Sequence, residues 1–159
     1  MRAAVLTVSD GVFEGTREDK SGEVLAELLG AGGHEVEREL VPDDREAIAT
    51  ALERLAGGCS LVVTTGGTGF GPRDVTPEAT RDVLDREAPG LAEAIRADSR
   101  AKTPYGMLSR GLAGIKGSCV IVNLPGSPGG ARDGYEVIRE ALPHAVKLVQ
   151  GAATAHRQT

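Results

Sequence analysis

The feature that most constrains the fold is a set of four short apolar runs, most of which are continuous rather than alternating. They are Ala3–Val8, His34–Val41, Leu61–Thr65 and Cys119–Leu124. Continuous apolar runs of roughly four to eight residues are typical of strands buried on both faces of a parallel sheet. Parallel strands need crossover connections, which are usually helices. The runs therefore predict a parallel sheet with helices between its strands.

Amphipathic stretches between these runs predict the helices. Ser21–Leu29 and Asp44–Leu55 each place their apolar residues on one stripe, as expected for helices that pack against a sheet. Gly30 and Gly57 occupy the positions at which these two helices should end.

A further helix is predicted from Thr76 to about Arg86. Thr76 offers an N-cap hydroxyl, Pro77 suits the first helical position, and Glu78 places an acid in the first turn. All three features favour a helix start at this point.

Two more helical segments follow, one from about Gly90 to Arg100 and one from Pro128 to Val149 with a break at Pro143. The element order is then β-α-β-α-β-α-α-β-α-α. This order favours an α/β fold, a three-layer αβα sandwich with a mostly parallel sheet and right-handed crossovers. Because the 159 residues contain no linker or charge block, we expect a single domain over residues 1–159.

Composition narrows the classes of function. The formal net charge is −5 and the aromatic residues are only Phe13, Phe70, Tyr105 and Tyr135. An acidic chain with so few rings lacks the basic surface and the stacking platform that nucleic-acid binders use. Any phosphate that this protein holds must therefore be bound by local groups or by a metal ion.

Targeting signals and reactive cysteines are not expected. The chain has neither a signal-peptide pattern nor an apolar stretch near the roughly 20 residues of a membrane span, so we expect a cytoplasmic protein. Cys59 and Cys119 are far apart and without CxxC partners, which favours plain buried thiols. The three histidines are scattered, which argues against a histidine metal site.

The residues that follow each predicted strand are the candidates for ligand binding, because open parallel sheets bind ligands beyond the carboxyl ends of their strands. All four ends are polar or glycine-rich: residues 9–11, 42–44, 64–69 and 123–130. If the strands are parallel, these segments meet at one edge of the sheet.

Two of these ends are candidate anion-binding loops. Glycines allow positive φ and close approach of a ligand, while backbone N–H groups and a following helix N-terminus attract phosphate. One such turn could serve only as a tight connection, but two with threonines and serines favour binding. The candidates from the strand ends are Ser9, Asp10, Thr65, Gly66, Gly67, Thr68, Gly69, Asn123, Pro125, Gly126 and Ser127.

Carboxylates at the same edge could hold Mg²⁺, which proteins bind through one or two carboxylates together with substrate phosphates. Asp43 and Asp74 are the candidates for this role. Asp44 precedes a predicted helix and is interpreted as its N-cap. Asp10 is either a turn former or a ligand contact.

Basic residues near this edge could pair with phosphate. Arg73, Arg110, Lys102 and Lys116 are within reach, and we favour the two arginines because a guanidinium can bind phosphate with two parallel hydrogen bonds. Residues 103–109, which include Ser109, are either a binding loop or an ordinary connector.

Seven motifs together resemble the molybdopterin adenylyltransferase family, which includes bacterial MogA and MoaB proteins and the G domain of gephyrin. They are Thr-Val-Ser-Asp at 7–10, Asp-Lys-Ser-Gly at 19–22, Val-Pro-Asp-Asp at 41–44, Thr-Thr-Gly-Gly-Thr-Gly at 64–69, Arg-Asp-Val-Thr-Pro-Glu-Ala at 73–79, Gly-Met-Leu-Ser-Arg at 106–110 and Asn-Leu-Pro-Gly-Ser-Pro at 123–128. The resemblance extends from about residue 3 to residue 150.

The resemblance implies a molybdopterin-binding fold that assembles as a homo-trimer or hexamer. It implies transfer of AMP from Mg-ATP to the terminal phosphate of molybdopterin, with release of pyrophosphate, and a molybdenum-insertion enzyme as a candidate partner. The two functional aspartates of the family correspond to Asp43 and Asp74. Because a terminal phosphate is largely ionised at neutral pH, we assign them to Mg²⁺ binding and substrate alignment rather than to proton abstraction.

Three alternatives remain open. Some MoaB proteins replace the Arg-Asp-Val-Thr-Pro motif and look inactive, so one alternative is a non-catalytic carrier of molybdopterin; retention of Asp43 and Asp74 favours the enzyme. The others are a scaffold like gephyrin's G domain, for which no partner domain is present, and a competence-damage-type domain of another pathway.

Overall fold

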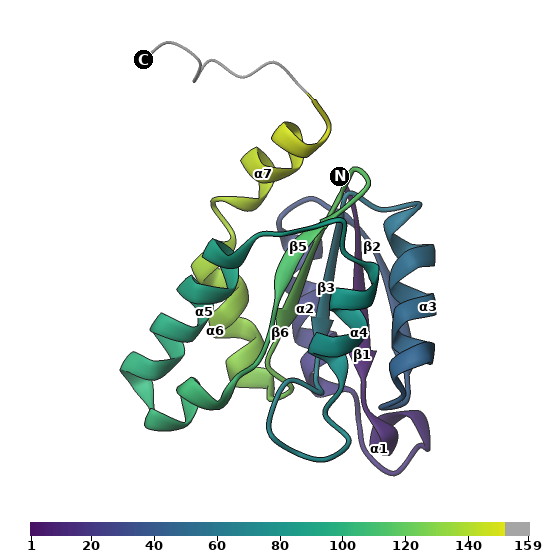
Figure 1. Cartoon of the computed structure of the whole chain (residues 1–159), viewed down its shortest axis with the longest axis vertical. Helices are drawn as coiled ribbons and strands as arrows, with labels where there is room; N and C mark the ends of the chain where they lie inside the picture. The colour runs from purple at the N-terminus through teal and green to yellow at the C-terminus, as the bar shows by residue number, and fades with distance from the viewer. Residues whose placement is uncertain (152–159) are drawn as a thin grey trace.

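The computed structural model describes residues 1–151 and shows three layers, with a six-stranded sheet between two layers of helices (Figure 1). The first half of the chain forms β1 (Arg2–Val8), α1 (Asp10–Phe13), α2 (Lys20–Ala31), β2 (Glu35–Val41), α3 (Arg45–Ala56) and β3 (Leu61–Thr65). The second half forms α4 (Thr76–Val83), β4 (Arg86–Glu87), α5 (Pro89–Lys102), the 3₁₀ helix η1 (Pro104–Leu108), β5 (Ala113–Lys116), β6 (Cys119–Leu124), α6 (Pro128–Ile138) and α7 (Leu142–Val149).

The strand order is β2-β1-β3-β6-β5-β4, and the first four strands are parallel. The predicted α/β class and its parallel strands are therefore confirmed. The sheet is extended by β5 and β4, which pair antiparallel and were not predicted. A two-residue Gly117-Ser118 turn between β5 and β6 is a hairpin signal that could have revealed β5.

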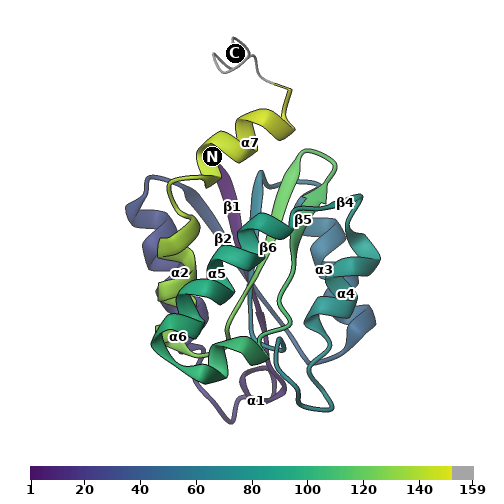
Figure 2. The ribbon, with the colours of Figure 1, turned by 60° about the vertical axis from the view of Figure 1, so that its left-hand side comes forward.

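Alternate residues of each strand pack on opposite faces of the sheet. Val5 and Val63 belong to a core covered by α2, α5 and α6, whereas Leu6 and Val62 belong to a core covered by α3 and α4 (Figure 2). Because both of their faces are buried, β1, β3 and β6 read as continuous apolar runs, whereas the edge strand β2 is partly exposed and alternates charged with apolar residues.

Three details of the helices differ from the predictions. Gly30 lies inside α2, which ends at Ala31 with Gly32 as its C-cap, followed by Gly33 with φ +84°. Thr76 is the first residue of α4 rather than its N-cap, and this helix stops at Val83 because β4 follows. Asp44 caps α3, and Gly57 ends it, as predicted.

The C-terminal helical segment is divided as predicted, but not at the proline itself. The break lies between Ile138 and Leu142, and Pro143 sits in the first turn of α7, where its missing N–H costs no hydrogen bond.

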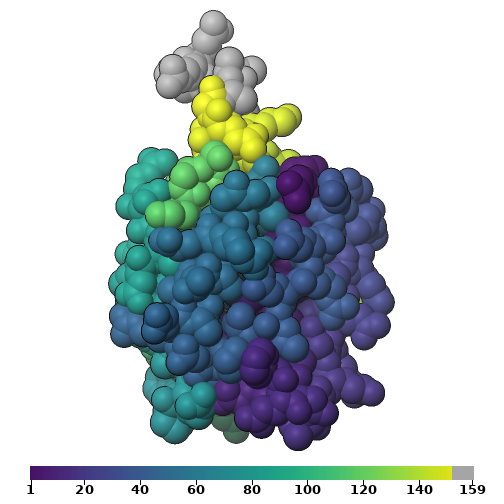
Figure 3. Space-filling model, turned by 90° about the vertical axis from the view of Figure 1, so that its right-hand side faces the viewer, coloured from purple at the N-terminus to yellow at the C-terminus, as the bar shows by residue number. Residues whose placement is uncertain are grey.

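The carboxyl ends of the parallel strands lie together at one end of the molecule, opposite α7. In Figure 3 the large purple surface at the lower end belongs to the segment around α1, which follows β1, and it lies below the blue surface of α3. Cys59 and Cys119 are buried free thiols, and burial raises the pKa of Cys119 to about 12. Within residues 1–151, no helix has the length and apolar character needed to cross a membrane.

Candidate functional site

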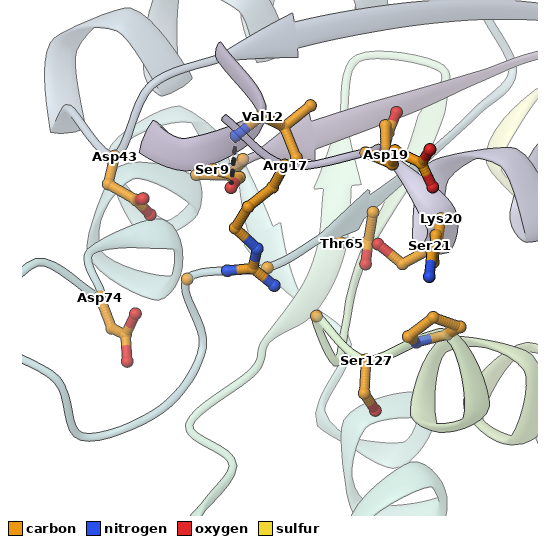
Figure 4. Close-up of a pocket in the computed structure, with 16 residues that line it drawn as sticks. Ser9, Val12, Arg17, Asp19, Lys20, Ser21, Asp43, Thr65, Asp74 and Ser127 are labelled. Carbon is orange, nitrogen blue, oxygen red and sulfur yellow. Dashed lines mark hydrogen bonds between the residues drawn. The ribbon is translucent and has the colours of Figure 1, made fainter. Parts of the chain in front are cut away.

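A pocket of about 620 Å³ opens where the parallel strands end (Figure 4). Four separate parts of the chain contribute to it: residues 8–21, Asp43, the β3 end with Asp74, and the loop after β6. Its lining consists of Val8, Ser9, Val12, Arg17, Glu18, Asp19, Lys20, Ser21, Asp43, Thr65, Gly66, Gly67, Asp74, Gly126, Ser127 and Pro128. The strand ends expected to converge from the sequence do converge.

The glycine turn after β3 forms the floor of the pocket and requires glycine at two positions. Gly66 has φ +100° and Gly67 has φ +69°, and a Cβ on Gly66 would collide with the carbonyl oxygen of Val8. The Thr76 hydroxyl donates to the carbonyl oxygen of Gly66 at 2.9 Å. The Thr65 hydroxyl donates to the carbonyl oxygen of Pro125 at 2.7 Å, which ties the two glycine-rich loops together.

The ends of β1 and β2 are joined by a reciprocal pair of hydrogen bonds. The backbone N–H of Asp10 donates to the Asp43 carboxylate at 2.9 Å, and the N–H of Asp43 donates to the Asp10 carboxylate at 3.0 Å. The Arg73 guanidinium donates to both oxygens of Asp10, at 2.6 and 3.1 Å, and to the carbonyl oxygen of Asp43. Arg73 is thus engaged in holding the aspartates.

Asp43 and Asp74 interact electrostatically across the glycine turn. Burial is the main reason why the pKa of Asp43 is raised, and the nearby carboxylates of Asp10 and Asp74 raise it further. In contrast, the hydrogen bond from Arg73 lowers the pKa of Asp10. Asp43 is thus a carboxylate of the pocket whose charged form is disfavoured, chiefly by burial.

These carboxylates fit Mg²⁺ better than a metal held by protein ligands alone. Residues 1–151 contain no group of three or more histidine, cysteine, aspartate or glutamate side chains that could hold a metal. Mg²⁺ keeps several waters and takes further ligands from phosphates, so two carboxylates suffice. A cation here would favour the charged form of Asp43, whose pKa is raised first by burial and then by the carboxylates of Asp10 and Asp74.

The segment from α1 to the first turn of α2 supplies pocket residues that the site prediction did not include: Val12, Arg17, Glu18, Asp19, Lys20 and Ser21. Asp19 has a structural role, since it caps α2 through the N–H of Gly22, accepts from the Thr7 hydroxyl and pairs with Arg38. The Asp-Lys-Ser-Gly motif at the start of α2 was a usable signal, because a helix N-terminus at this edge attracts anions.

Several predicted site residues lie outside the pocket lining. Asn123 is buried beneath it, where its amide donates to the hydroxyls of Thr64 and Thr80 and accepts from the N–H of Leu112. Asp10, Arg73, Thr68, Gly69, Pro125, Ser109 and Arg110 are also absent from the lining.

Arg110 supports the loop that carries Asp74. Its guanidinium donates to both carboxylate oxygens of Glu78 and to the carbonyl oxygens of Gly69 and Asp74. Because of these hydrogen bonds, Arg110 holds residues 69–74 in place and does not extend into the pocket.

The two lysines considered with the arginines also have partners. Lys102 pairs with Asp98 and Asp133. Lys116 stands at the turn before β6, at the opposite end of the sheet from the pocket, so the expectation that it lies near the pocket was wrong.

The three-layer architecture and the pocket at the carboxyl edge place the chain among α/β proteins that bind ligands where parallel strands end. The profile of the family described as a probable molybdopterin binding domain matches residues 4–144. Because this match covers most of the chain, the protein belongs to that family.

Individual relatives agree. The chain is 40% identical over 152 residues to a molybdopterin adenylyltransferase of Helicobacter pylori, covering 92% of this chain and 86% of that protein. It is 42% identical over 159 residues to the molybdenum cofactor synthesis protein cinnamon of Drosophila melanogaster, covering 98% of this chain but only 26% of that longer protein. The crystal structure of the molybdopterin biosynthesis enzyme MoaB from Thermus thermophilus matches with a TM-score of 0.88 and 50% identity, covering 94% of this chain and 96% of that one.

Proposed function

We propose that this protein is a molybdopterin adenylyltransferase, which transfers AMP from Mg-ATP to the terminal phosphate of molybdopterin. The observation that carries the proposal is the meeting of Asp43 and Asp74 at a glycine turn in one pocket. Relatives with this name are 34–40% identical over most of the chain, which supports the same activity here.

In the proposed reaction a phosphate oxygen of molybdopterin attacks the α-phosphorus of ATP. The new P–O bond forms as the bond from the α-phosphorus to the bridging oxygen breaks, and pyrophosphate leaves with that electron pair. Since the attacking phosphate is largely ionised at neutral pH, no general base is needed. The protein has to bring anions together and hold them in line.

The pocket has groups suited to this task. Helices α2 and α6 both begin at it, and their N-termini direct partial positive charge toward bound phosphates. Asp43 and Asp74 would hold Mg²⁺, which supplies charge neutralisation on the phosphates. Arg110 fixes the loop of Asp74, and Arg73 fixes Asp10 and the backbone of Asp43.

The decisive experiment measures pyrophosphate release from purified molybdopterin and Mg-ATP. Wild type should release pyrophosphate, and Asp74→Asn should lower turnover by about 100-fold or more, because one charge that aligns the phosphates is lost. Molybdopterin binding should persist in the variant.

Thermal denaturation of Asp74→Asn serves as the control for folding. Wild-type protein that binds molybdopterin without releasing pyrophosphate would be a carrier and would refute the enzyme assignment. Unchanged turnover in Asp74→Asn would refute the role of that aspartate.

We also propose that the chain assembles as a homo-trimer or hexamer, as the family resemblance implies. Tyr105, Met107 and Leu108 on η1 are exposed apolar side chains, which a subunit contact would cover. Sedimentation equilibrium would detect the assembly, and a monomer at micromolar concentration would contradict it. We further propose that the adenylylated product passes to a molybdenum-insertion enzyme.

A further inference from the structure

Two cationic side chains line the pocket, Arg17 and Lys20. Neither side chain makes a hydrogen bond or ion pair within residues 1–151. The arginine favoured from the sequence, Arg73, is instead occupied by Asp10. Lys20 falls within a family motif, but no motif of the resemblance includes residues 11–18, so Arg17 has no assigned role.

The loop holds Arg17 by its backbone. The carbonyl oxygen of Gly11 accepts from the N–H of Thr16 at 2.9 Å, from the Thr16 hydroxyl at 3.1 Å and from the N–H of Arg17 at 3.2 Å. Gly15, with φ +81°, makes the turn that brings the chain back to Gly11. Three hydrogen bonds to the carbonyl oxygen of Gly11 therefore hold this part of the loop.

The stem of the Arg17 side chain also rests on Gly11. A Cβ added to Gly11 would lie 2.7 Å from Cδ and 3.1 Å from Cγ of Arg17, so a larger residue would displace the arginine. The absence of a side chain at position 11 thus makes room for the path that Arg17 takes.

From this position the Arg17 guanidinium extends into the pocket. Figure 4 shows it between Asp43 and Asp74 on one side and Thr65 and Ser127 on the other. Asp19 is paired with Arg38, and Glu18 makes no ion pair with Arg17 in the described part of the chain. The guanidinium is therefore available to donate hydrogen bonds to an anionic ligand.

We propose that Arg17 is a phosphate-binding residue of this pocket and that Gly11 keeps its side chain in place. A guanidinium suits this role because its donors form a planar fork that matches two phosphate oxygens. The inference rests on the proposed function only for the identity of the ligand, which is either the triphosphate of ATP or the phosphate of molybdopterin.

The test measures equilibrium binding of three probes, namely Mg-ATP, inorganic pyrophosphate with Mg²⁺, and molybdopterin. Arg17→Ala should weaken binding of at least one probe by about 10-fold or more, as expected for loss of hydrogen bonds to a charged group. Arg17→Lys should restore part of the affinity. Loss of ATP and pyrophosphate binding would identify the triphosphate, and loss of molybdopterin binding alone would identify the pterin phosphate.

Arg81→Ala is the matched control, because it removes the same charge from an exposed arginine on α4 outside the pocket. It should bind all probes as wild type does. Gly11→Ala should weaken the same probe as Arg17→Ala without removing a charge, which separates local binding from a change in net charge.

The inference is overturned if Arg17→Ala binds all three probes as tightly as wild type, or if wild type binds none of them. The experiment distinguishes failure of this inference from failure of the proposed function. Binding that depends on Arg17 without pyrophosphate release would support the phosphate site and refute the adenylyltransferase. Turnover with binding that does not depend on Arg17 would support the adenylyltransferase and refute the phosphate site.

Discussion

On the acidic wall of the pocket, formed by Asp43 and Asp74, both carboxylates accept hydrogen bonds from the protein. The N–H of Asp10, whose own carboxylate pairs with Arg73, donates to Asp43, and the N–H of Gly71 donates to Asp74. On the basic wall, Arg17 extends from the loop before α2 and Lys20 from the first residue of α2, and neither side chain has a partner in residues 1–151. The acidic wall therefore has its geometry before a ligand arrives, whereas the basic wall gains its partners only from a ligand.

An acidic protein can bind anions with such a division of charge. Carboxylates repel phosphates unless both bind the same cation, and this requires the carboxylates to be held in a fixed arrangement. The reciprocal hydrogen bonds between Asp10 and Asp43 fix the position of Asp43. Arg17 and Lys20 are exposed, so they remain hydrated without a partner, and an exposed ion pair would add at most about 1 kcal/mol of stability. The raised pKa of Asp43 indicates that this carboxylate is retained at a cost in stability.

The largest expected effect that would test this comparison is that of Asp43→Asn on the acidic wall. Turnover should fall by about 100- to 1,000-fold, because a charge that orders the phosphates is removed. The thermal midpoint should stay equal or rise, because burial and neighbouring carboxylates disfavour the charged form and an amide oxygen can still accept from the N–H of Asp10. A coupled pyrophosphate assay and calorimetry measure the two effects.

The thermal midpoint of the same variant also has an outcome that contradicts a preformed acidic wall. A clear fall in the thermal midpoint of Asp43→Asn would mean that the ionised carboxylate stabilises the fold, and the two walls would then not differ as described. Asp44→Asn is the matched control, because Asp44 caps α3 and an asparagine caps nearly as well.

A smaller effect is expected from Asn123→Ala, since Asn123 lies beneath the pocket and belongs to neither wall. The free energy of unfolding should fall by about 1–3 kcal/mol, because buried partners such as the N–H of Leu112 lose their hydrogen bonds. Affinity for Mg-ATP should change little. A binding defect larger than the stability defect would place Asn123 in contact with ligand.

The smallest expected effect is the change in stability in mild acid. The pKa values of Asp43 and Asp10 are shifted in opposite directions, so the two residues affect stability differently. The pKa of Asp43 is raised, so its protonation on acidification relieves repulsion and does not destabilise the fold. The pKa of Asp10 is lowered by Arg73, so its stabilising contribution persists until the pH falls below about 4, the usual aspartate range.

Mg-ATP binding should consequently weaken on acidification while the fold remains intact. Titration calorimetry and thermal midpoints between neutral pH and pH values near 5 would show the separation. Simultaneous loss of both would contradict the opposite signs of the two aspartates.

Much of this arrangement could be predicted from the sequence, because it depends on local period and spacing. The apolar runs determined four parallel strands, and parallel strands bring their carboxyl ends to one edge, so Asp43, Asp74 and the glycine turns were expected together. The edge formed by β5 and β4 was not predicted, because strands of four and two residues are too short to show a pattern of apolar and polar residues.

The layers, the positions of the parallel strands along the chain and the segments that meet at the pocket all followed from sequence patterns. Only the tertiary structure decided which charge pairs with which: Arg73 with Asp10, Arg110 with Glu78, and Arg17 with no partner in residues 1–151. The physical reason is that a strand or helix follows from neighbours in the chain, whereas an ion pair joins groups as far apart as residues 10 and 73, and their distance exists only once the sheet has formed.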